Sequence, residues 1–338
     1  MAHDHHDHGH GHPRGLRGLF RPHRHTALFP IDSNLEASRL GKRALWLSLL
    51  GLAATAAAQL VVALLSGSVA LLNDTFHNGA DALTVLPLWL AFTVGRRAAT
   101  SRFTYGFGRA EDLAGVAIVL FIAASGLFAA FESVRRLMDP AEVSYLPAVM
   151  AAAVIGFAGN EAVARLRINT GTRIGSAALI ADGLHARTDG LGSLGVLAGA
   201  VGVALGVERA DAVAGLVIAV VILKVFWEAA TGVGLRLMDG VEPGLAERVS
   251  GILAAVPGAL GVGELRLRWI GHRLHCEAEV RVDDRLSVVE GHRIAEDARH
   301  ALLHQVPMLA KVIIHADPAS ADGVDHHAEV RHHDGPPA

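Results

Sequence analysis

The chain has 338 residues, of which 51% are hydrophobic and only 5% aromatic, a composition typical of an integral membrane protein. Its 30 basic and 33 acidic residues give a formal net charge of −3 and no basic surface for nucleic acid. The single cysteine, Cys276, excludes an intrachain disulfide and a thiolate metal cluster, so any metal site must use histidine and carboxylate ligands.

Both ends of the chain are rich in histidine. The first 25 residues hold eight histidines and no long apolar run, so they do not form a secretory signal peptide. We expect residues 1–38 to be a disordered cytoplasmic tail that attracts metal, with an expression tag as the alternative interpretation. Residues 319–338 have a similar composition and should form a second such tail.

Six apolar runs are long enough to cross a membrane, since a spanning helix needs about 20 residues. An even number of spans puts both termini on one side, and basic residues gather before the first span and after the second and fourth. The positive-inside rule therefore predicts cytoplasmic termini, although Arg135 and Arg136 at the outer end of the third span count against it. The predicted transmembrane domain covers 39–238, with spans near 44–65, 69–94, 113–137, 146–163, 176–205 and 212–229.

The second and fifth spans carry the same polar pattern, D-x2-H-x3-D. The histidine and the last aspartate share a helix face because they are four residues apart. Ionisable groups inside a span mark an ion path, and four N/O ligands from two helices suit tetrahedral Zn²⁺, with Co²⁺ and Cd²⁺ as competitors. One such pair could equally be an interhelical hydrogen bond, but its repetition at identical spacing favours metal. The predicted ligands are His77, Asp81, His185 and Asp189.

Other residues in these two spans are given supporting roles. Asp74 and Asp182 lie one turn before each histidine and could be ligands, orienting groups or proton carriers; we assign them to orienting or structural roles. Asn78 is close enough to line the same path. In the fifth span, glycines would allow close helix approach, namely Gly190, Gly192, Gly195 and Gly199.

After Asp239 the apolar runs shorten, and residues 239–318 predict a soluble α+β domain of order αββαβ. Strands follow from strict alternation near 265–269 and 274–282, and a capping box at Ser287 and Glu290 predicts a helix to about residue 305. A short third strand is expected at 312–315. Cys276 falls on an apolar face and should be an inert core residue. Four histidines are expected on the solvated surface: His272, His275, His300 and His304. Among them, His275 is the first candidate for an exception.

These features resemble the cation diffusion facilitators, a family that includes zinc transporters. The resemblance covers nearly the whole chain outside the tails and rests on the six spans, the two H-x3-D pairs and the segments "GFGRAEDLAG", "ESVRRLMDP" and "VIIHADP". It implies a homodimer of a bacterial inner membrane, paired through a metallochaperone-like cytoplasmic domain. Such a protein exchanges cytoplasmic divalent metal for protons at the two H-x3-D pairs. It has no resident cofactor, and Zn²⁺ is both its expected substrate and the candidate structural ion of the cytoplasmic domain.

Two departures from the family pattern affect the metal sites. Some relatives bind an extra metal through histidines in the loop after the second span, where this chain has Phe103 and Phe107, so no such site is expected. In the cytoplasmic domain a further family ligand position falls on Gly263. That site is therefore expected to be altered or partly lost, with surface groups that hold no metal as the alternative. Its candidate ligands are His292, His315, Asp317 and Glu279.

The sequence thus predicts a transporter and not an enzyme, one that exports Zn²⁺ from the cytoplasm, with Co²⁺, Cd²⁺ and Ni²⁺ as the alternative substrates. Protons and metal would compete for histidines that titrate near pH 6.5, and two imidazoles favour Zn²⁺ over Mn²⁺. An intramembrane metalloenzyme would need three ligands, an open water position and a general base. A metal sensor or storage protein would not need six spans. The N-terminal tail would either collect metal for delivery or buffer it.

Overall fold

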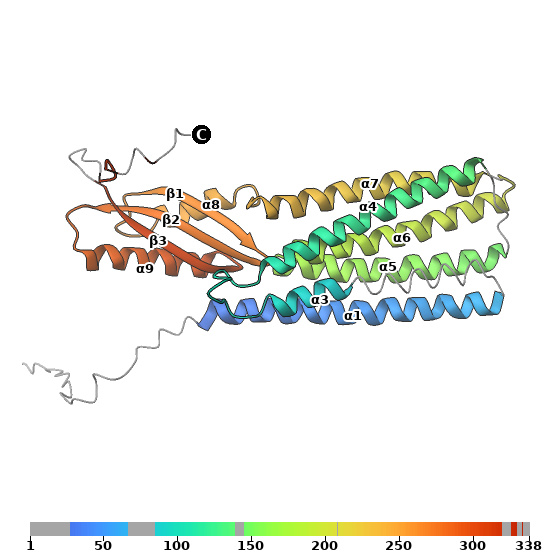
Figure 1. Ribbon diagram of the computed structural model, residues 1–338, viewed down its shortest axis with the longest axis horizontal. Helices are drawn as coiled ribbons and strands as arrows, with labels where there is room; N and C mark the ends of the chain where they lie inside the picture. The colour runs from blue at the N-terminus through green and yellow to red at the C-terminus, as the bar shows by residue number, and fades with distance from the viewer. Residues whose placement is uncertain are drawn as a thin grey trace, which may run out of the picture.

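A computed structural model describes residues 28–66, 85–138, 145–207, 209–319, 326–329 and 333. Within these residues, a bundle of long helices carries a smaller α/β domain at one end (Figure 1). The first helix of the bundle begins at the same end as the α/β domain. Outside the described residues lie the predicted N-terminal tail up to residue 27, most of the C-terminal tail, and His77, Asp81, Asp74 and Asn78.

Four bundle helices are long and apolar enough to cross a membrane in the described part of the chain: α1, α4, α5 and α7. Helix α6 is as long but carries Asp182, Arg187 and Asp189 and is not among those four. Helix α3 has only ten described residues. The bundle helices are α1 (Leu28–Ser66), α3 (Val85–Val94), α4 (Arg109–Met138), α5 (Leu146–Ile174), α6 (Ala177–Ala204) and α7 (Ala210–Leu237).

The first helix begins earlier than the sequence predicted. Residues 28–38, expected in the disordered tail, continue α1 toward the α/β domain. Ala37 and Ser38 are buried there, and Ser38 Oγ contacts His272 of that domain. This part of the chain is therefore ordered by contacts with residues distant in sequence, and a local sequence pattern could not predict it.

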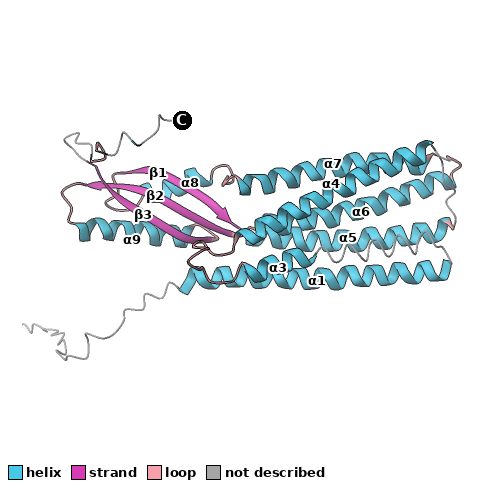
Figure 2. Ribbon diagram, in the orientation of Figure 1, coloured by secondary structure: helices cyan, strands magenta, loops and turns pink. Residues whose placement is uncertain are grey.

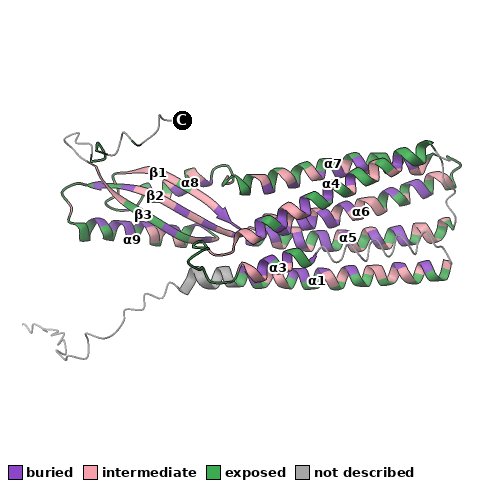
Figure 3. Cartoon of the chain, in the orientation of Figure 1, coloured by how far each residue is buried: buried purple, intermediate pink, exposed green. Residues whose placement is uncertain are grey.

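Many residues along the bundle helices are exposed (Figure 3), and large apolar side chains are numerous among them, as expected for helices surrounded by lipid. Leu64, Leu120, Phe131 and Val220 are each more than 60% exposed, which a water-soluble bundle would not tolerate in such numbers. At the end remote from the α/β domain, Arg136 bonds Glu132 and Asp211, so it ties α4 to α7.

Glycines bring α6 against its neighbours. A Cβ added at Gly195 would lie 2.6 Å from Ile218, and one at Gly199 would lie 2.6 Å from Asp211. A Cβ at Gly190 would lie 3.3 Å from that of Asn160, which is tight. Gly192 differs, because nothing lies within 4 Å of a Cβ there. Three of the four glycines thus have the predicted packing role.

The α/β domain has the predicted order αββαβ (Figure 2). Strands β1 and β2 form an antiparallel hairpin, and β3 adds parallel to β2 after the crossover through α9. Both helices contact the same sheet face and share one core with it. The elements are α8 (Leu245–Ala254), β1 (Gly261–Ile270), β2 (Arg273–Asp283), α9 (Val288–Gln305) and β3 (Leu309–Ala319).

Two local predictions in this domain are confirmed. Ser287 and Glu290 form the capping box that starts α9. Cys276 is 1% exposed in the core, and burial raises the pKa of its thiol to about 11, so it stays protonated and does not act as a thiolate ligand.

The four histidines expected at the surface divide into three cases. His300 and His304 are exposed on α9, as predicted. His275 is half-buried, and burial together with nearby Arg268, Lys311 and Arg273 lowers its pKa to about 4, so its imidazole is neutral. The prediction for His272 is wrong: it is only 6% exposed, because the turn between β1 and β2 inserts it among the bundle helices.

Candidate metal sites

The described half of the transmembrane motif lies on one face of α6. His185 is buried, and its Nδ1 lies 3.9 Å from Oδ1 of Asp189, whose side chain is 19% exposed. Two ligands on one zinc ion at about 2.1 Å in a tetrahedron would be about 3.4 Å apart, so a small side-chain movement lets both atoms share a cation. The backbone carbonyl of His185 accepts a bond from Thr188 Oγ1, within the same helix.

The first aspartate of the motif is paired with an arginine. Asp182 is 0% exposed and its Oδ2 lies 3.1 Å from Nη1 of Arg167, which is 1% exposed on α5. The same Nη1 donates to the Asp182 carbonyl at 3.4 Å. A carboxylate held by a guanidinium is a poor ligand for a further cation, which agrees with a supporting role for Asp182.

The surroundings of this motif are close-packed. A Cβ at Gly183 would lie 2.6 Å from Ile168 Cγ1 and 3.0 Å from Arg167 Cβ, so the absent side chain brings α6 against α5 at the ion pair. Asn160 on α5 is buried opposite Gly190. Buried Gln59 of α1 donates to the Ala152 carbonyl at 3.1 Å and so joins α1 to α5.

The four candidate ligands of the cytoplasmic domain are divided between two faces of the sheet. His315 and Asp317 are two residues apart on β3 and share one face. His292 lies on α9 and lines a cavity of about 350 Å³ with Ile314 and Ala316, on the opposite face. Within the described part of one chain, His292 is therefore not brought to His315 and Asp317.

The Glu279 carboxylate lies in the space that a side chain at position 263 would fill. Glu279 pairs with His315 in the β2–β3 register, but its Oε2 accepts from the backbone N–H of Glu264 at 3.1 Å. A Cβ at Gly263 would lie 2.6 Å from that same oxygen. A side chain at position 263 would therefore displace the Glu279 carboxylate.

A third histidine joins the β3 pair from the C-terminal segment. Nε2 of His327 lies 3.6 Å from Oδ1 of Asp317, and one ligand atom from each of His315, Asp317 and His327 lies within 4.8 Å of the others. Its composition predicts only a general metal-attracting role for this segment, because spacing along the chain does not indicate where a tail folds back.

The junction between bundle and α/β domain contains a buried polar network that no local sequence pattern indicates. His272 Nδ1 lies 2.7 Å from Glu111 Oε2 of α4, and its Nε2 lies 3.2 Å from Ser38 Oγ of α1. Ser176, the N-cap of α6, donates to the other oxygen of Glu111. Four buried polar side chains from three helices and one strand turn thus form a connected network. A carboxylate at the start of an apolar span was the available signal, but it also suits a helix N-terminus on its own.

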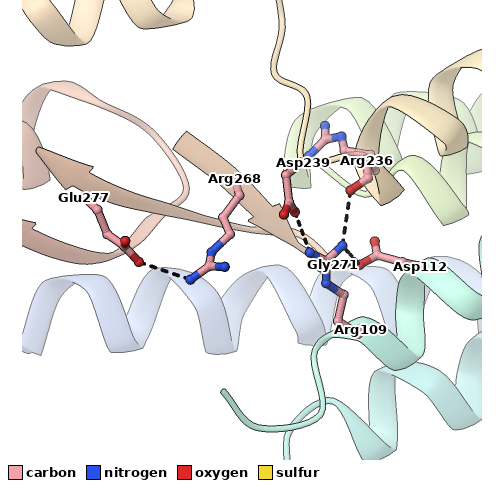
Figure 4. Close-up of polar contacts among 7 residues, drawn as sticks. All are labelled: Arg109, Asp112, Arg236, Asp239, Arg268, Gly271 and Glu277. Atoms are coloured by element: carbon pink, nitrogen blue, oxygen red, sulfur yellow. Dashed lines mark hydrogen bonds and ion pairs between the residues drawn. The ribbon is translucent and has the colours of Figure 1, made fainter. Parts of the chain in front are cut away.

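Beside this network, a second group of contacts fixes the hairpin and the end of α7 (Figure 4). The N–H of Gly271 donates to Asp112 Oδ2 at 3.2 Å. Arg109 donates to the Arg236 carbonyl at 3.2 Å and to Asp239 Oδ1 at 2.5 Å. The α/β domain is therefore attached to α4 by direct polar contacts, in addition to its covalent connection to α7.

Comparison with known proteins places both parts of the chain. Residues 45–238 match the family model of the cation efflux transmembrane domain, and residues 242–319 match that of the cation efflux protein cytoplasmic domain. A probable cation efflux system protein of Mycobacterium tuberculosis is 51% identical over 319 residues, covering 94% of this chain and 96% of the relative.

More distant relatives agree. The cation-efflux pump FieF of Yersinia pestis is 28% identical over 298 residues, covering 84% of this chain and 96% of the pump. Magnetosome protein MamB of Magnetospira sp. is 27% identical over 259 residues, covering 76% and 88% respectively. The chain belongs to the cation efflux family of membrane transporters, the cation diffusion facilitators.

Proposed function

We propose that this chain exports divalent metal ions, Zn²⁺ foremost, from the cytoplasm in exchange for protons. The observation that carries the proposal is the buried His185, one turn from Asp189 on α6, inside a bundle whose outer surface is apolar. Ionisable side chains inside a membrane-spanning bundle are costly, so the fold alone does not explain this pair, and a role in ion transport does.

The remaining ligands of the proposed site are His77 and Asp81, whose motif repeats that of α6. His185 lies eight residues after the start of α6, about 12 Å along the helix axis from the end that faces the α/β domain. If that end is cytoplasmic, as the basic loops suggest, metal reaches the site from the α/β side. We propose that both termini are cytoplasmic and that two copies pair through the cytoplasmic domain.

Proton coupling would follow from the chemistry of the ligands. Metal binds neutral imidazole and ionised carboxylate, so a more acidic outer side displaces it by protonating the same atoms. Arg167 forms an ion pair with Asp182. Metal and protons would therefore compete for the other two groups of the motif on α6, His185 and Asp189. Two imidazoles with two carboxylates suit Zn²⁺, Co²⁺ and Cd²⁺ better than Mn²⁺.

The test is metal flux into vesicles that contain the purified full-length protein. Loss of a group that only orients a ligand costs about 10–100-fold, so His185→Ala should lower Zn²⁺ flux by no less than about tenfold. His304→Ala, exposed on α9, is the matched control and should leave flux unchanged. Unchanged flux in His185→Ala would refute the site.

Proton exchange is tested separately in the same vesicles. Collapsing the proton gradient should abolish Zn²⁺ accumulation beyond equilibrium, and accumulation that continued would rule out antiport. Competition by Co²⁺, Cd²⁺ and Mn²⁺ ranks the substrates, with Mn²⁺ expected to compete least. Net flux of this kind also distinguishes a transporter from a metal store or an intramembrane enzyme.

A further inference from the structure

We infer that the C-terminal segment closes a divalent-metal site on the edge strand β3, with His327 as a ligand beside His315 and Asp317. The site is separate from the proposed transport site and does not depend on transport. It goes beyond the ligands expected for this domain, because one of its three donors comes from the tail.

The β3 pair presents two donors and lacks a third from the folded domain. His315 and Asp317 lie on the sheet face that the helices leave uncovered, whereas His292 is with Ile314 and Ala316 on the other face. The neighbouring Glu279 carboxylate accepts a backbone hydrogen bond from β1. A third donor is therefore best supplied from outside the sheet.

The tail supplies such a donor in the described structure. Nε2 of His327 is 3.6 Å from Asp317 Oδ1, close to the separation of about 3.4 Å expected for two ligands of one tetrahedral ion. Oδ1 of Asp317 is buried and accepts no hydrogen bond from the described residues. A buried carboxylate oxygen facing an imidazole nitrogen has unused capacity that a cation would satisfy.

The donor set indicates the class of metal. Two imidazole nitrogens and one carboxylate oxygen suit Zn²⁺ or Co²⁺, whereas Mg²⁺ and Ca²⁺ prefer sites made of oxygen alone. The three donor atoms already lie within 4.8 Å of one another, so binding requires movements of about 1 Å. Strand β3 is at the sheet edge, so the tail reaches it without displacing another strand. Metal would thus fasten the C-terminal segment to the cytoplasmic domain.

Trypsin cleavage after Arg331, four residues beyond His327, reports on this closure in the full-length protein. Cleavage follows the population of the open tail, so Zn²⁺ at about ten times its Kd should slow it about tenfold. Intact-mass measurement of the product that lacks residues 332–338 gives the rate. Ca²⁺ at the same concentration should have no effect.

Matched variants decide which residues hold the tail. Trypsin should cleave His327→Ala and Asp317→Asn at the same rate with and without Zn²⁺. In His326→Ala, which changes the neighbouring histidine, Zn²⁺ should still slow cleavage. Equal melting of all variants in chelator shows that the domain remains folded. Protection that persists in His327→Ala or Asp317→Asn, or that is lost equally in His326→Ala, overturns the inference. Zn²⁺ flux into vesicles bears on the proposed function alone, so the two can fail independently.

Discussion

Arg167 and Asp182 place a complete ion pair inside the transmembrane bundle, at 1% and 0% exposure. Removing two charges from water is costly, and only close contact between them offsets the cost. The contact fixes Asp182 one turn before His185, and it leaves Nε and Nη2 of Arg167 without a hydrogen-bond partner among the described residues. The arginine is thus an orienting and charge-balancing group of the proposed site, which its position in the sequence did not reveal.

The pair should reveal itself in a double-mutant cycle. Asp182→Asn or Arg167→Met leaves one buried charge without its counter-ion, and each should destabilise the protein by about 3–5 kcal/mol. The double variant should be more stable than the sum of the two losses predicts, because no lone charge remains. Thermal unfolding in detergent, followed by intrinsic fluorescence, measures the shift in melting temperature.

The control for this cycle is Arg165→Met on the same helix. Arg165 is 71% exposed in its contact with Glu161, so its loss should cost no more than about 1 kcal/mol. Strictly additive losses in the Arg167 and Asp182 variants would mean that the two side chains do not stabilise each other.

Between elements, the close approach of α5 and α6 depends on positions that lack a side chain. Gly183 faces Ile168 and Arg167, and Gly171 faces Ile180 across the same contact. Backbone atoms are among those neighbours, so a rotamer change could not make room. The distance between the helices, and with it the position of His185, is set by these glycines.

Gly183→Ala should therefore separate α5 from α6 beside the proposed site. Its Cβ would lie 2.9 Å from the Ile168 backbone nitrogen, and such overpacking typically costs about 1–3 kcal/mol. We expect a lower melting temperature and slower Zn²⁺ flux in vesicles. Gly192→Ala on the same helix meets nothing within 4 Å and should be neutral or slightly stabilising. Similar behaviour of the two variants would contradict the packing argument.

Elements with a strong local pattern could be predicted from the sequence. The capping box placed the start of α9, alternation placed β1 and β2, and the D-x2-H-x3-D repeat identified His185 and Asp189 as a pair on one helix face. What local pattern could not show was contact between distant segments. The early start of α1, the burial of His272 and the Arg167 partner of Asp182 all depend on such contacts.

For the molecule as a whole, the β1–β2 turn connects the domain with several helices of the bundle. His272 reaches Ser38 of α1 and Glu111 of α4, and its ring lies 5.7 Å from that of Phe92 on α3. Through Ser176, Glu111 also contacts the start of α6, the helix with His185. A tilt of the cytoplasmic domain cannot occur without disturbing this network. The turn therefore links the position of the α/β domain to the ends of α1, α4 and α6.

His272→Ala should loosen this connection without unfolding either part. It leaves the buried Glu111 carboxylate with Ser176 as its described partner, and an unsatisfied buried group costs about 1–3 kcal/mol. Local opening of the turn should then become about 5–150-fold more frequent, and the amide of Gly271, which donates to Asp112, should exchange faster with deuterium. Mass spectrometry of peptides covering 268–274 measures this, with exposed His300→Ala as control and His272→Gln as partial rescue. Because the α9 amides lie in the domain's own core, they should keep their protection from exchange. An equal rise of exchange in α9 would mean general unfolding of the domain. Unchanged exchange at the β1–β2 turn would mean that His272 does not hold the turn in place.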